Sequence, residues 1–184
     1  MTVIVPCDSI EAKKATIAAA KTDTPVYIRL AREKTPIVTT EETPFEIGKA
    51  QVFFEPKVDI KKQVGIIACG SMVYNAIMAA KELEEEGIMA SVLNLSTIKP
   101  LDGEGVMIFV KKHEAIVTVE EHQIAGGMGS AVSEFLSQNH PMPIEFVGVR
   151  DKFGQSGTPE ELIEHYGMGV SHIKEAVKKA VSKI

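Results

Sequence analysis

The last two thirds of the chain alternate between short apolar runs and longer segments in which apolar residues recur at helical spacing. Four β-branched apolar runs predict strands at residues 64–68, 90–95, 115–119 and 144–149. The segments around them predict helices at 72–86, 103–112, 128–138, 159–165 and 171–183, with a proline-containing loop at 96–102. Near-continuous apolar strands alternating with helices are typical of a parallel sheet covered on both faces. The pattern therefore predicts an α/β fold with a doubly wound, mostly parallel sheet.

A smaller unit of the same kind precedes this sheet. Strands are predicted at 3–5 and 25–32, and a helix at 10–21 that Asp8 or Ser9 can cap. This order predicts one parallel βαβ crossover, which cannot bury both faces of its own sheet. A proline-rich and polar connection follows, with one short extended piece at 51–54. We therefore place a partial βαβ unit at 1–50, a linker at 51–62 and the main domain at 63–184.

Two helix starts in the main domain carry cap signals. Ser71 precedes the helix at 72–86 and is predicted to cap it. Thr158, followed by Pro159, is a strong start signal for the helix at 159–165. Both helices follow strand ends, so these caps lie where an α/β sheet presents its loops.

Composition limits the classes of function. The 184 residues are 45% hydrophobic and 24% charged, and the net charge of -5 arises from interspersed acids. A nucleic-acid or membrane-surface partner is not expected, because no basic patch or long apolar run is present. Cys7 and Cys69 stand far apart without a second ligand at metal spacing, so we expect neither a disulfide nor a zinc site. A cytoplasmic protein is the expectation.

The segment from Val117 to Val132 places polar groups at a strand end and then a glycine turn before a helix. Such an edge is where α/β proteins meet ligands and partners. Gly126, Gly127 and Gly129 do not complete the dinucleotide-binding fingerprint, because Val132 stands where the last small residue is needed. The glycines are better explained by close packing or a hydrogen bond at the helix start.

His122 follows Glu120 and Glu121, so it could be a general base whose basicity its acidic neighbours raise. Adjacent strand residues point in different directions, however, and no nucleophile or metal partner is in view. A structural or interface role is favoured over the catalytic one. The other histidines show no ligand pattern and are interpreted as surface or loop positions: His113, His140, His165 and His172.

Arg32 stands at the carboxyl end of the second predicted strand, where a guanidinium can bind a phosphate or carboxylate. From the residues alone, a solvated arginine is an equally good interpretation. Arg29 is interpreted as a salt-bridge or interface residue. The glycine-containing loop at 150–157 is predicted to lie at the same sheet edge as His122, where it could meet a domain, a partner chain or a ligand.

Several segments together resemble the transketolase family. Residues 68–71 (ACGS), 94–102 (NLSTIKPLD), 118–132 (TVEEHQIAGGMGSAV) and 151–167 (DKFGQSGTPEELIEHYG) are similar to its C-terminal domain, in the family's order. Residues 3–8 (VIVPCD), 25–36 (PVYIRLAREKTP) and 45–50 (FEIGKA) resemble the end of its pyrimidine-binding domain and the linker after it. The resemblance implies that residues 1–50 are a remnant of the pyrimidine-binding domain.

The resemblance also implies an activity and a cofactor. Transketolases transfer a two-carbon ketol unit between sugar phosphates with thiamine diphosphate and a divalent metal such as magnesium, a reaction of the pentose phosphate pathway. The arginine that matches Arg32 helps to hold the substrate phosphate. The Gly-Asp-Gly motif that holds the metal is absent, and the chain begins after the region of the activating glutamate. The resemblance therefore implies no catalytic, cofactor-binding or metal-binding residue in this chain, and an inactive fragment on its own.

The expected partners are a second copy, forming a homodimer, and the N-terminal section of the enzyme. Glu120, Glu121, His122 and the glycines at 126, 127 and 129 are then an assembly edge. The alternatives are a stand-alone dimerisation or docking module, or the C-terminal part of a 2-oxoacid dehydrogenase β subunit or of deoxyxylulose-phosphate synthase. The segment FGQSGTPEELIEHYG favours the transketolase interpretation.

Overall fold

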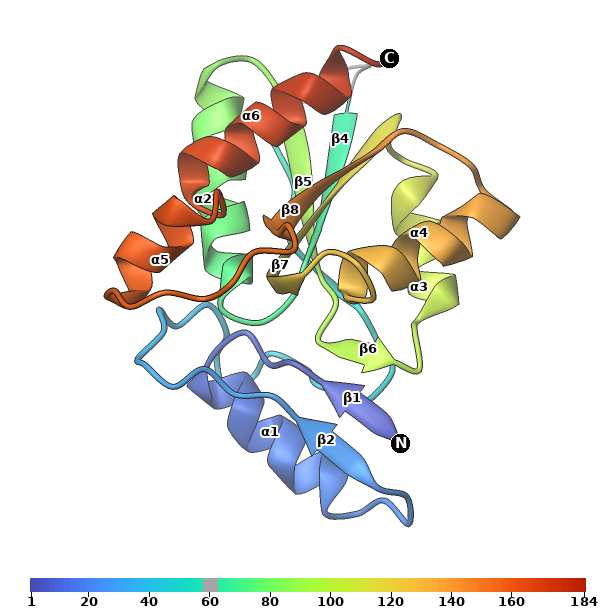
Figure 1. The fold of residues 1–184 in the computed structure, drawn as a ribbon. Coiled ribbons are helices and arrows are strands. Elements are labelled where there is room, and N and C mark those ends of the chain that lie inside the picture. The colour runs from blue at the N-terminus through green and yellow to red at the C-terminus, as the bar shows by residue number, and fades with distance from the viewer. Residues whose placement is uncertain (58–62) are drawn as a thin grey trace.

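Two sheets organise the chain in the computed structural model, which describes residues 1–57 and 63–184 (Figure 1). The larger sheet has the strand order β3-β5-β4-β7-β8. Four of its strands are parallel and β3 is antiparallel at one edge, which confirms a mostly parallel sheet. The strand bounds are β3 Gln51–Phe54, β4 Gln63–Ala68, β5 Met89–Asn94, β7 Ala115–Gln123 and β8 Ile144–Val149.

Helices cover both faces of this sheet, as the continuous apolar strands required (Figure 1). Alternate residues of β4 supply the two cores: Ile66 packs in the cluster beneath α2 and α6, and Ile67 in the cluster beneath α3 and α4. Both isoleucines are fully buried. The helix bounds are α2 Met72–Glu85, α3 Gly103–Val110, α4 Met128–Asn139, α5 Pro159–His165 and α6 Val170–Val181.

The N-terminal unit, residues 1–50, supplies two of the three strands of a second sheet with the order β2-β1-β6. β1 (Thr2–Ile4) and β2 (Val26–Ile28) pair in parallel across α1 (Ser9–Ala19), as the βαβ prediction required. β6 (Thr97–Lys99) pairs with β1 in the antiparallel sense, although it comes from the segment expected to be a loop. A strand of the main domain thus closes one side of the small sheet.

The linker expected at 51–62 is described only in part. Its extended piece is β3, which pairs with β5 and extends the larger sheet. Residues 58–62 lie outside the described part of the chain, so the rest of that prediction is not addressed. Backbone hydrogen bonds join the N-terminal unit to the main domain, from Val5 N–H to Ser96 O (2.7 Å) and from Gly70 N–H to Val5 O (3.1 Å).

One local prediction was wrong because a nearby partner was not visible in the sequence. Ser71 does not cap α2: it has helical φ and ψ angles, and its Oγ donates to Glu121 Oε2 at 2.7 Å. His113 lies in the loop between α3 and β7, one of the two kinds of position expected for it, but it is only 7% exposed, with Nδ1 2.8 Å from the carbonyl oxygen of Phe109. Thr158, by contrast, forms the predicted cap, and Glu161 completes a capping box with it.

Candidate functional site

Glu120 lies near the carboxyl end of β7 and is only 2% exposed. Its two carboxylate oxygens accept hydrogen bonds from the backbone N–H groups of Met128 (2.6 Å) and Gly129 (2.7 Å) at the start of α4. The preceding residue, Gly127, has no side chain with which to cap the helix, so Glu120 satisfies these donors from the sheet. The predicted hydrogen bond at the helix start is therefore present, and a buried glutamate makes it.

The glycines of this turn are needed for two different reasons. A Cβ on Gly129 would stand 2.6 Å from Thr118 Oγ1, and one on Gly127 would collide with the Glu120 carboxylate and the Gln123 carbonyl. Gly126 instead has open space around it but a φ of +78°, which L side chains rarely adopt. The cluster allows a helix start to approach a carboxylate closely.

Burial raises the pKa of Glu120, and this effect exceeds the lowering by the Gly129 and Met128 amides and by the charges of His122 and Arg29. Arg29 is half-buried and follows β2, so it brings a positive charge from the N-terminal unit towards the β7 tip. The sequence interpretation treated Arg29 only as a salt-bridge or interface residue. Its position three residues before Arg32 gave no sign of a link to Glu120.

Glu121 and His122 have partners that differ from those of Glu120. Glu121 accepts the hydroxyl of Ser71, whereas the His122 side chain is 52% exposed, with Nδ1 2.9 Å from the Gln123 carbonyl oxygen. His122 Nδ1 stands 4.0 Å from Glu120 Oε2, close enough for an electrostatic effect but beyond hydrogen-bond distance. The three neighbours therefore share one strand end, and each has hydrogen-bond partners of its own.

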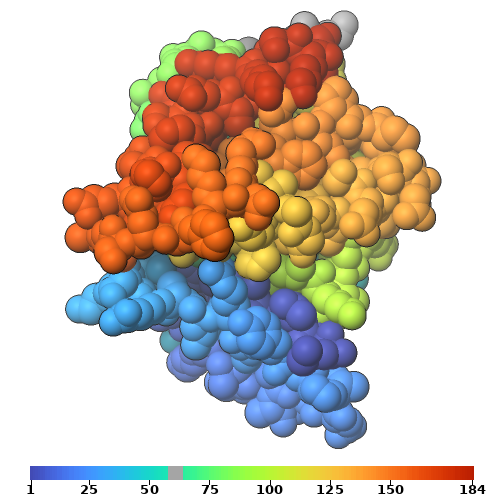
Figure 2. All heavy atoms as spheres, in the orientation of Figure 1, coloured from blue at the N-terminus to red at the C-terminus, as the bar shows by residue number. Residues whose placement is uncertain are grey.

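The loop at 150–157 lies beside this tip, as predicted. The backbone N–H of Asp151 donates to Gln123 Oε1 at 2.9 Å, and Tyr166 donates its hydroxyl to the Phe153 carbonyl at 2.7 Å. Phe153 is 100% exposed. In Figure 2 the N-terminal unit, in blue, lies directly below the yellow and orange surface of this edge.

Arg32 lies in the N-terminal unit and is not part of the β7 tip. β2 ends at Ile28, so Arg32 follows in an irregular segment and not at the last strand position. Its side chain is 96% exposed, with Nε 3.9 Å from Glu33 Oε1. The structure thus separates the residues proposed from sequence into two places, the β7 tip and the segment after β2.

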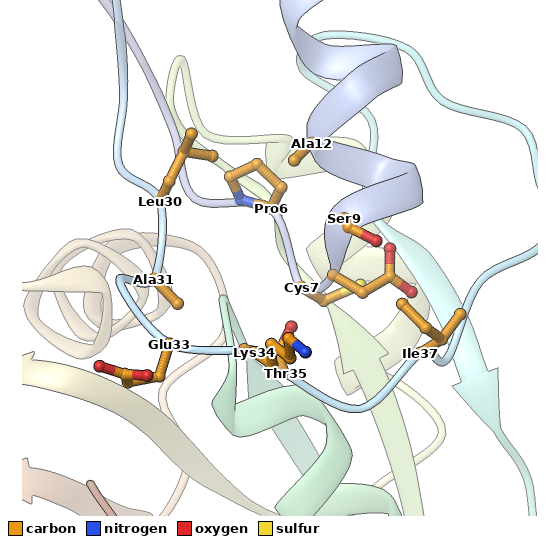
Figure 3. Close-up of a pocket in the computed structure, with 11 residues that line it drawn as sticks. Pro6, Cys7, Ser9, Ala12, Leu30, Ala31, Glu33, Lys34, Thr35 and Ile37 are labelled. Carbon is orange, nitrogen blue, oxygen red and sulfur yellow. The ribbon is translucent and has the colours of Figure 1, made fainter.

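A cavity of about 460 Å³ opens beside that segment (Figure 3). One wall is the turn from β1 into α1 and the other is the segment after β2, so both walls follow the carboxyl ends of two adjacent parallel strands. Sequence analysis missed the cavity, although ligand sites are common at such strand ends. The lining residues are Pro6, Cys7, Asp8, Ser9, Ala12, Leu30, Ala31, Glu33, Lys34, Thr35 and Ile37.

Asp8 fastens the two walls together. Oδ1 accepts the Glu11 N–H at the start of α1 (2.8 Å), and Oδ2 accepts the N–H groups of Val38 (2.8 Å) and Thr39 (2.7 Å). The Thr39 hydroxyl also lies 2.8 Å from Oδ1. Burial raises the pKa of Asp8, but these hydrogen bonds together outweigh it, and the net pKa is below the ordinary value. Asp8 is therefore an ionised structural clamp.

A second buried carboxylate lies behind the cavity. Glu11 accepts the Cys7 N–H (2.6 Å) and the side-chain amide of Asn94 (2.8 Å). Burial raises the pKa of Glu11 more than these hydrogen bonds lower it. Burial likewise raises the pKa of the Cys7 thiol, with Glu11 adding to the effect, so the thiol stays protonated and is a poor nucleophile.

Residues 1–57 and 63–184 contain no metal-ligand cluster and no membrane-spanning helix. No group of three or more His, Cys, Asp or Glu side chains in those ranges is placed to hold a metal ion. No helix there combines the length and the apolar character needed to cross a bilayer.

Comparisons with known proteins give a consistent result. Residues 55–173 match the family described as "Transketolase, C-terminal domain". The chain is 39% identical over 183 residues to the 6-deoxy-6-sulfo-D-fructose transketolase subunit of Clostridium sp. (strain MSTE9), and it covers 55% of that protein. It is 34% identical over 184 residues to an apulose-4-phosphate transketolase subunit of Phocaeicola vulgatus, of which it covers 57%. Both alignments include 100% of this chain.

A solved structure described as "Split gene transketolase, inactive beta4 tetramer" has the same fold, with a TM-score of 0.92 and 42% sequence identity. The similarity covers 99% of this chain and 58% of that one. The chain thus spans a little more than half the length of these three proteins.

Proposed function

The chain belongs to the transketolase family, and from this premise we propose that it is the C-terminal part of an enzyme that transfers a two-carbon ketol unit between sugar phosphates. The observation that carries the proposal is the match of nearly the whole fold to a chain of a split transketolase, at a TM-score of 0.92. The two relatives named as transketolase subunits support it from sequence.

In the complete enzyme we propose thiamine diphosphate and magnesium as cofactors. When bound, this cofactor supplies a carbanion that carries the transferred unit. The residues of this chain do not fit the diphosphate and metal site, because the sequence has no Gly-Asp-Gly and the described residues present no acidic or histidine cluster for a metal. We therefore assign both groups to an N-terminal section, and expect the chain alone to be inactive.

The small sheet supports the proposal that a partner covers the N-terminal unit. Its order, β2-β1-β6, leaves β2 as an edge strand, and an open edge of this kind invites pairing. Tyr27 in β2 and Leu30 after it are 52% and 58% exposed, although both are large apolar side chains. The proposed occupant is the N-terminal section, for which residues 1–50 supply the remnant of the pyrimidine-binding domain.

We further propose that the β7 tip contributes to a homodimer. The exposed positions His122 and Gly126 and the fully exposed Phe153 lie on one edge. The side chain of Gln123 accepts the Asp151 N–H and holds the loop that carries Phe153. Glu120, Gly127 and Gly129 support this edge from within, and Glu121 is fixed by Ser71. These residues shape the surface and are not proposed to react.

Arg32 is proposed to contact the phosphate of the sugar. Its side chain is 96% exposed, and its one ion-pair contact among residues 1–57 and 63–184 is Glu33 at 3.9 Å, so the guanidinium is free to turn towards an anion. A guanidinium binds a phosphate through two parallel hydrogen bonds. One relative is named for a sulfo-sugar and the other for a sugar phosphate, which supports a substrate with an anionic end group.

Cofactor binding tests the assignment of thiamine diphosphate to the N-terminal section. Calorimetric titration of thiamine diphosphate with magnesium into the chain alone is expected to give no saturable heat. The same titration into the chain co-purified with an N-terminal transketolase section is expected to saturate in the micromolar range, about 8 kcal/mol of binding free energy. Tight binding by the chain alone would refute the assignment of the cofactor to the other section.

A further inference from the structure

We propose that Lys34 determines substrate specificity by binding the anionic end group of the sugar, a phosphate or a sulfonate, in the cavity beside α1. This inference rests on the proposed function and adds a second cation to Arg32. It rests on the charged side chains that line the cavity and on the partners that each of them has.

The cavity has the size and position of a binding site. Its volume of about 460 Å³ lies in the range of small-molecule pockets. It is bounded by the β1–α1 turn and by the segment after β2, and Lys34 and Thr35 lie side by side between Glu33 and Ile37 in Figure 3. Arg32 is not among the lining residues, although Glu33 and Lys34 next to it are.

Three charged side chains line the cavity: the carboxylates of Asp8 and Glu33 and the ammonium group of Lys34. The Asp8 carboxylate is buried and accepts backbone N–H groups from Glu11, Val38 and Thr39, so its oxygens are satisfied. Glu33 stands 3.9 Å from Arg32. Lys34 has no ion pair or side-chain hydrogen bond with any residue of the described ranges, whereas Lys13 and Lys14 on α1 both have partners. Lys34 is therefore the one cation of the lining, and its ammonium group is available to an anion.

The remaining lining suits a sugar and not a covalent reaction. Ser9 and Thr35 offer hydroxyl groups, while Pro6, Leu30 and Ile37 offer apolar surface. The Cys7 thiol is held protonated by burial, so it supplies no nucleophile. A polyol with one anionic end would match hydroxyl groups along the wall and the ammonium group at the Lys34 side.

Anion binding by the chain alone is the first test. Inorganic phosphate and, separately, sulfate are titrated into the 184-residue chain at fixed ionic strength, and the side-chain resonances of lysine are followed by NMR. A saturable shift at Lys34, in the millimolar range, is expected. Lys34→Met should abolish it and Lys34→Arg should retain it. Lys21→Met, at an exposed lysine after α1 without an ion pair in the described residues, should leave it unchanged.

Equal shifts at Lys34, Lys21 and other surface lysines, with no effect of Lys34→Met, would mean an adventitious ion only and would overturn the proposal. The variants must keep the melting temperature of the wild type, which the exposed position of Lys34 leads us to expect. Because this test needs no partner section, it decides on Lys34 even if ketol transfer is never observed.

Kinetics of the assembled enzyme give the second test. Lys34→Met is expected to raise KM for a ketose phosphate by roughly tenfold to a hundredfold with little change in kcat, as for loss of one charge-assisted hydrogen bond. Arg32→Ala, measured in parallel, should raise KM by a separate factor. An unchanged KM in Lys34→Met, in an enzyme that turns over normally, would refute the role of Lys34 while leaving the proposed function intact.

The two anions are separated by pH. A phosphate monoester gains its second charge with a pKa of about 6, whereas a sulfonate stays singly charged. If the site takes phosphate, KM should fall as pH rises through about 6 in the wild type, and this fall should shrink in Lys34→Met. A pH-independent KM for a ketose sulfonate that is lower than that for the phosphate would assign the sulfonate instead. If Lys34→Met changes KM for neither substrate, the proposal fails.

Discussion

Glu11 and Asn94 lie 83 residues apart in the sequence and are joined by a buried hydrogen bond of 2.8 Å. Glu11 belongs to α1 in the N-terminal unit, and Asn94 ends β5 in the main domain. The side chains are therefore a polar link between the two parts of the chain. Asn94 Oδ1, which is also buried, has no hydrogen-bond partner among the described residues.

Asn94→Ala is expected to destabilise the chain by about 1–3 kcal/mol, because Oε1 of the buried Glu11 carboxylate loses its donor while Oε2 keeps the Cys7 N–H. Urea unfolding measures the change, and Asn139→Ala is the control, since the amide of Asn139 bonds an exposed helix carbonyl. The control should stay within about 0.5 kcal/mol of the wild type. An equal effect of the two substitutions would contradict the link.

The raised pKa of Glu11 makes the stability of the fold depend on pH in a defined direction. Between its ordinary value of 4.5 and the higher folded value, the folded state binds more protons, so stability falls as pH rises through this window. Glu11→Gln mimics the protonated acid and should flatten that part of the pH profile. Glu120 has a raised pKa too, so some slope should remain. An unaltered slope in Glu11→Gln would show that Glu11 does not titrate there.

Asp8→Asn should act in the opposite pH range. Asp8 has a lowered pKa in the folded chain, so its stabilising effect is present above the unfolded value near 3.8 and is lost as pH falls through the folded value. At neutral pH the substitution should cost about 2 kcal/mol, and wild type and variant should converge in acid. Asp23→Asn, at an exposed position, is the control and should have little effect at any pH. A cost that persists below the folded pKa would rule out the charge as its source.

Gly129→Ala tests the close approach at the start of α4. Its Cβ would stand 2.6 Å from Thr118 Oγ1 and 2.9 Å from Phe146 Cδ1, so the packing must shift, at a cost of about 1–3 kcal/mol. Gly154→Ala adds a Cβ that meets nothing within 4 Å and should be nearly neutral. Thermal unfolding compares the two. A neutral Gly129→Ala would mean that the glycine is not required by packing.

His122→Ala tests the assembly edge. The side chain is half exposed and touches no reacting group, so its loss should weaken self-association about fivefold to tenfold and leave turnover of the assembled enzyme nearly unchanged. Sedimentation velocity over a concentration series measures the association, with His165→Ala at another exposed histidine as control. A loss of turnover without a change in association would restore the catalytic interpretation of His122.

The central sheet could be predicted from the sequence because its apolar strands are continuous and their helices carry clear boundaries. The buried position of Glu120 at the end of β7 could not be predicted. In the sequence Glu120 is an acidic residue at a strand end, and its burial depends on backbone N–H groups eight and nine residues later. β6 was hidden for a similar reason. Thr97 and Ile98 are β-branched, but the strand has three residues and ends directly before Pro100, and its pairing with β1 is a long-range contact.

In the candidate site, too, some residues have a local sequence signal and others depend on long-range contacts. Arg32 and His122 were found because charged residues after strands are a local signal. The cavity needed two segments, at residues 6–12 and 30–37, that meet only because β1 and β2 pair in parallel. Lys34 became a candidate only when the structure placed it in the lining of the cavity, with Asp8 hydrogen-bonded to Val38 and Thr39 and not to the lysine.

As one section of a transketolase, this chain is proposed to need the other section for activity. The most direct measurement is ketol transfer from a ketose phosphate to an aldose phosphate, with thiamine diphosphate and magnesium, as the chain is titrated into a fixed amount of an N-terminal section. Turnover is predicted to be absent for either section alone and to rise until the two are equimolar. Turnover by this chain alone, or none at any ratio despite complex formation, would contradict the account.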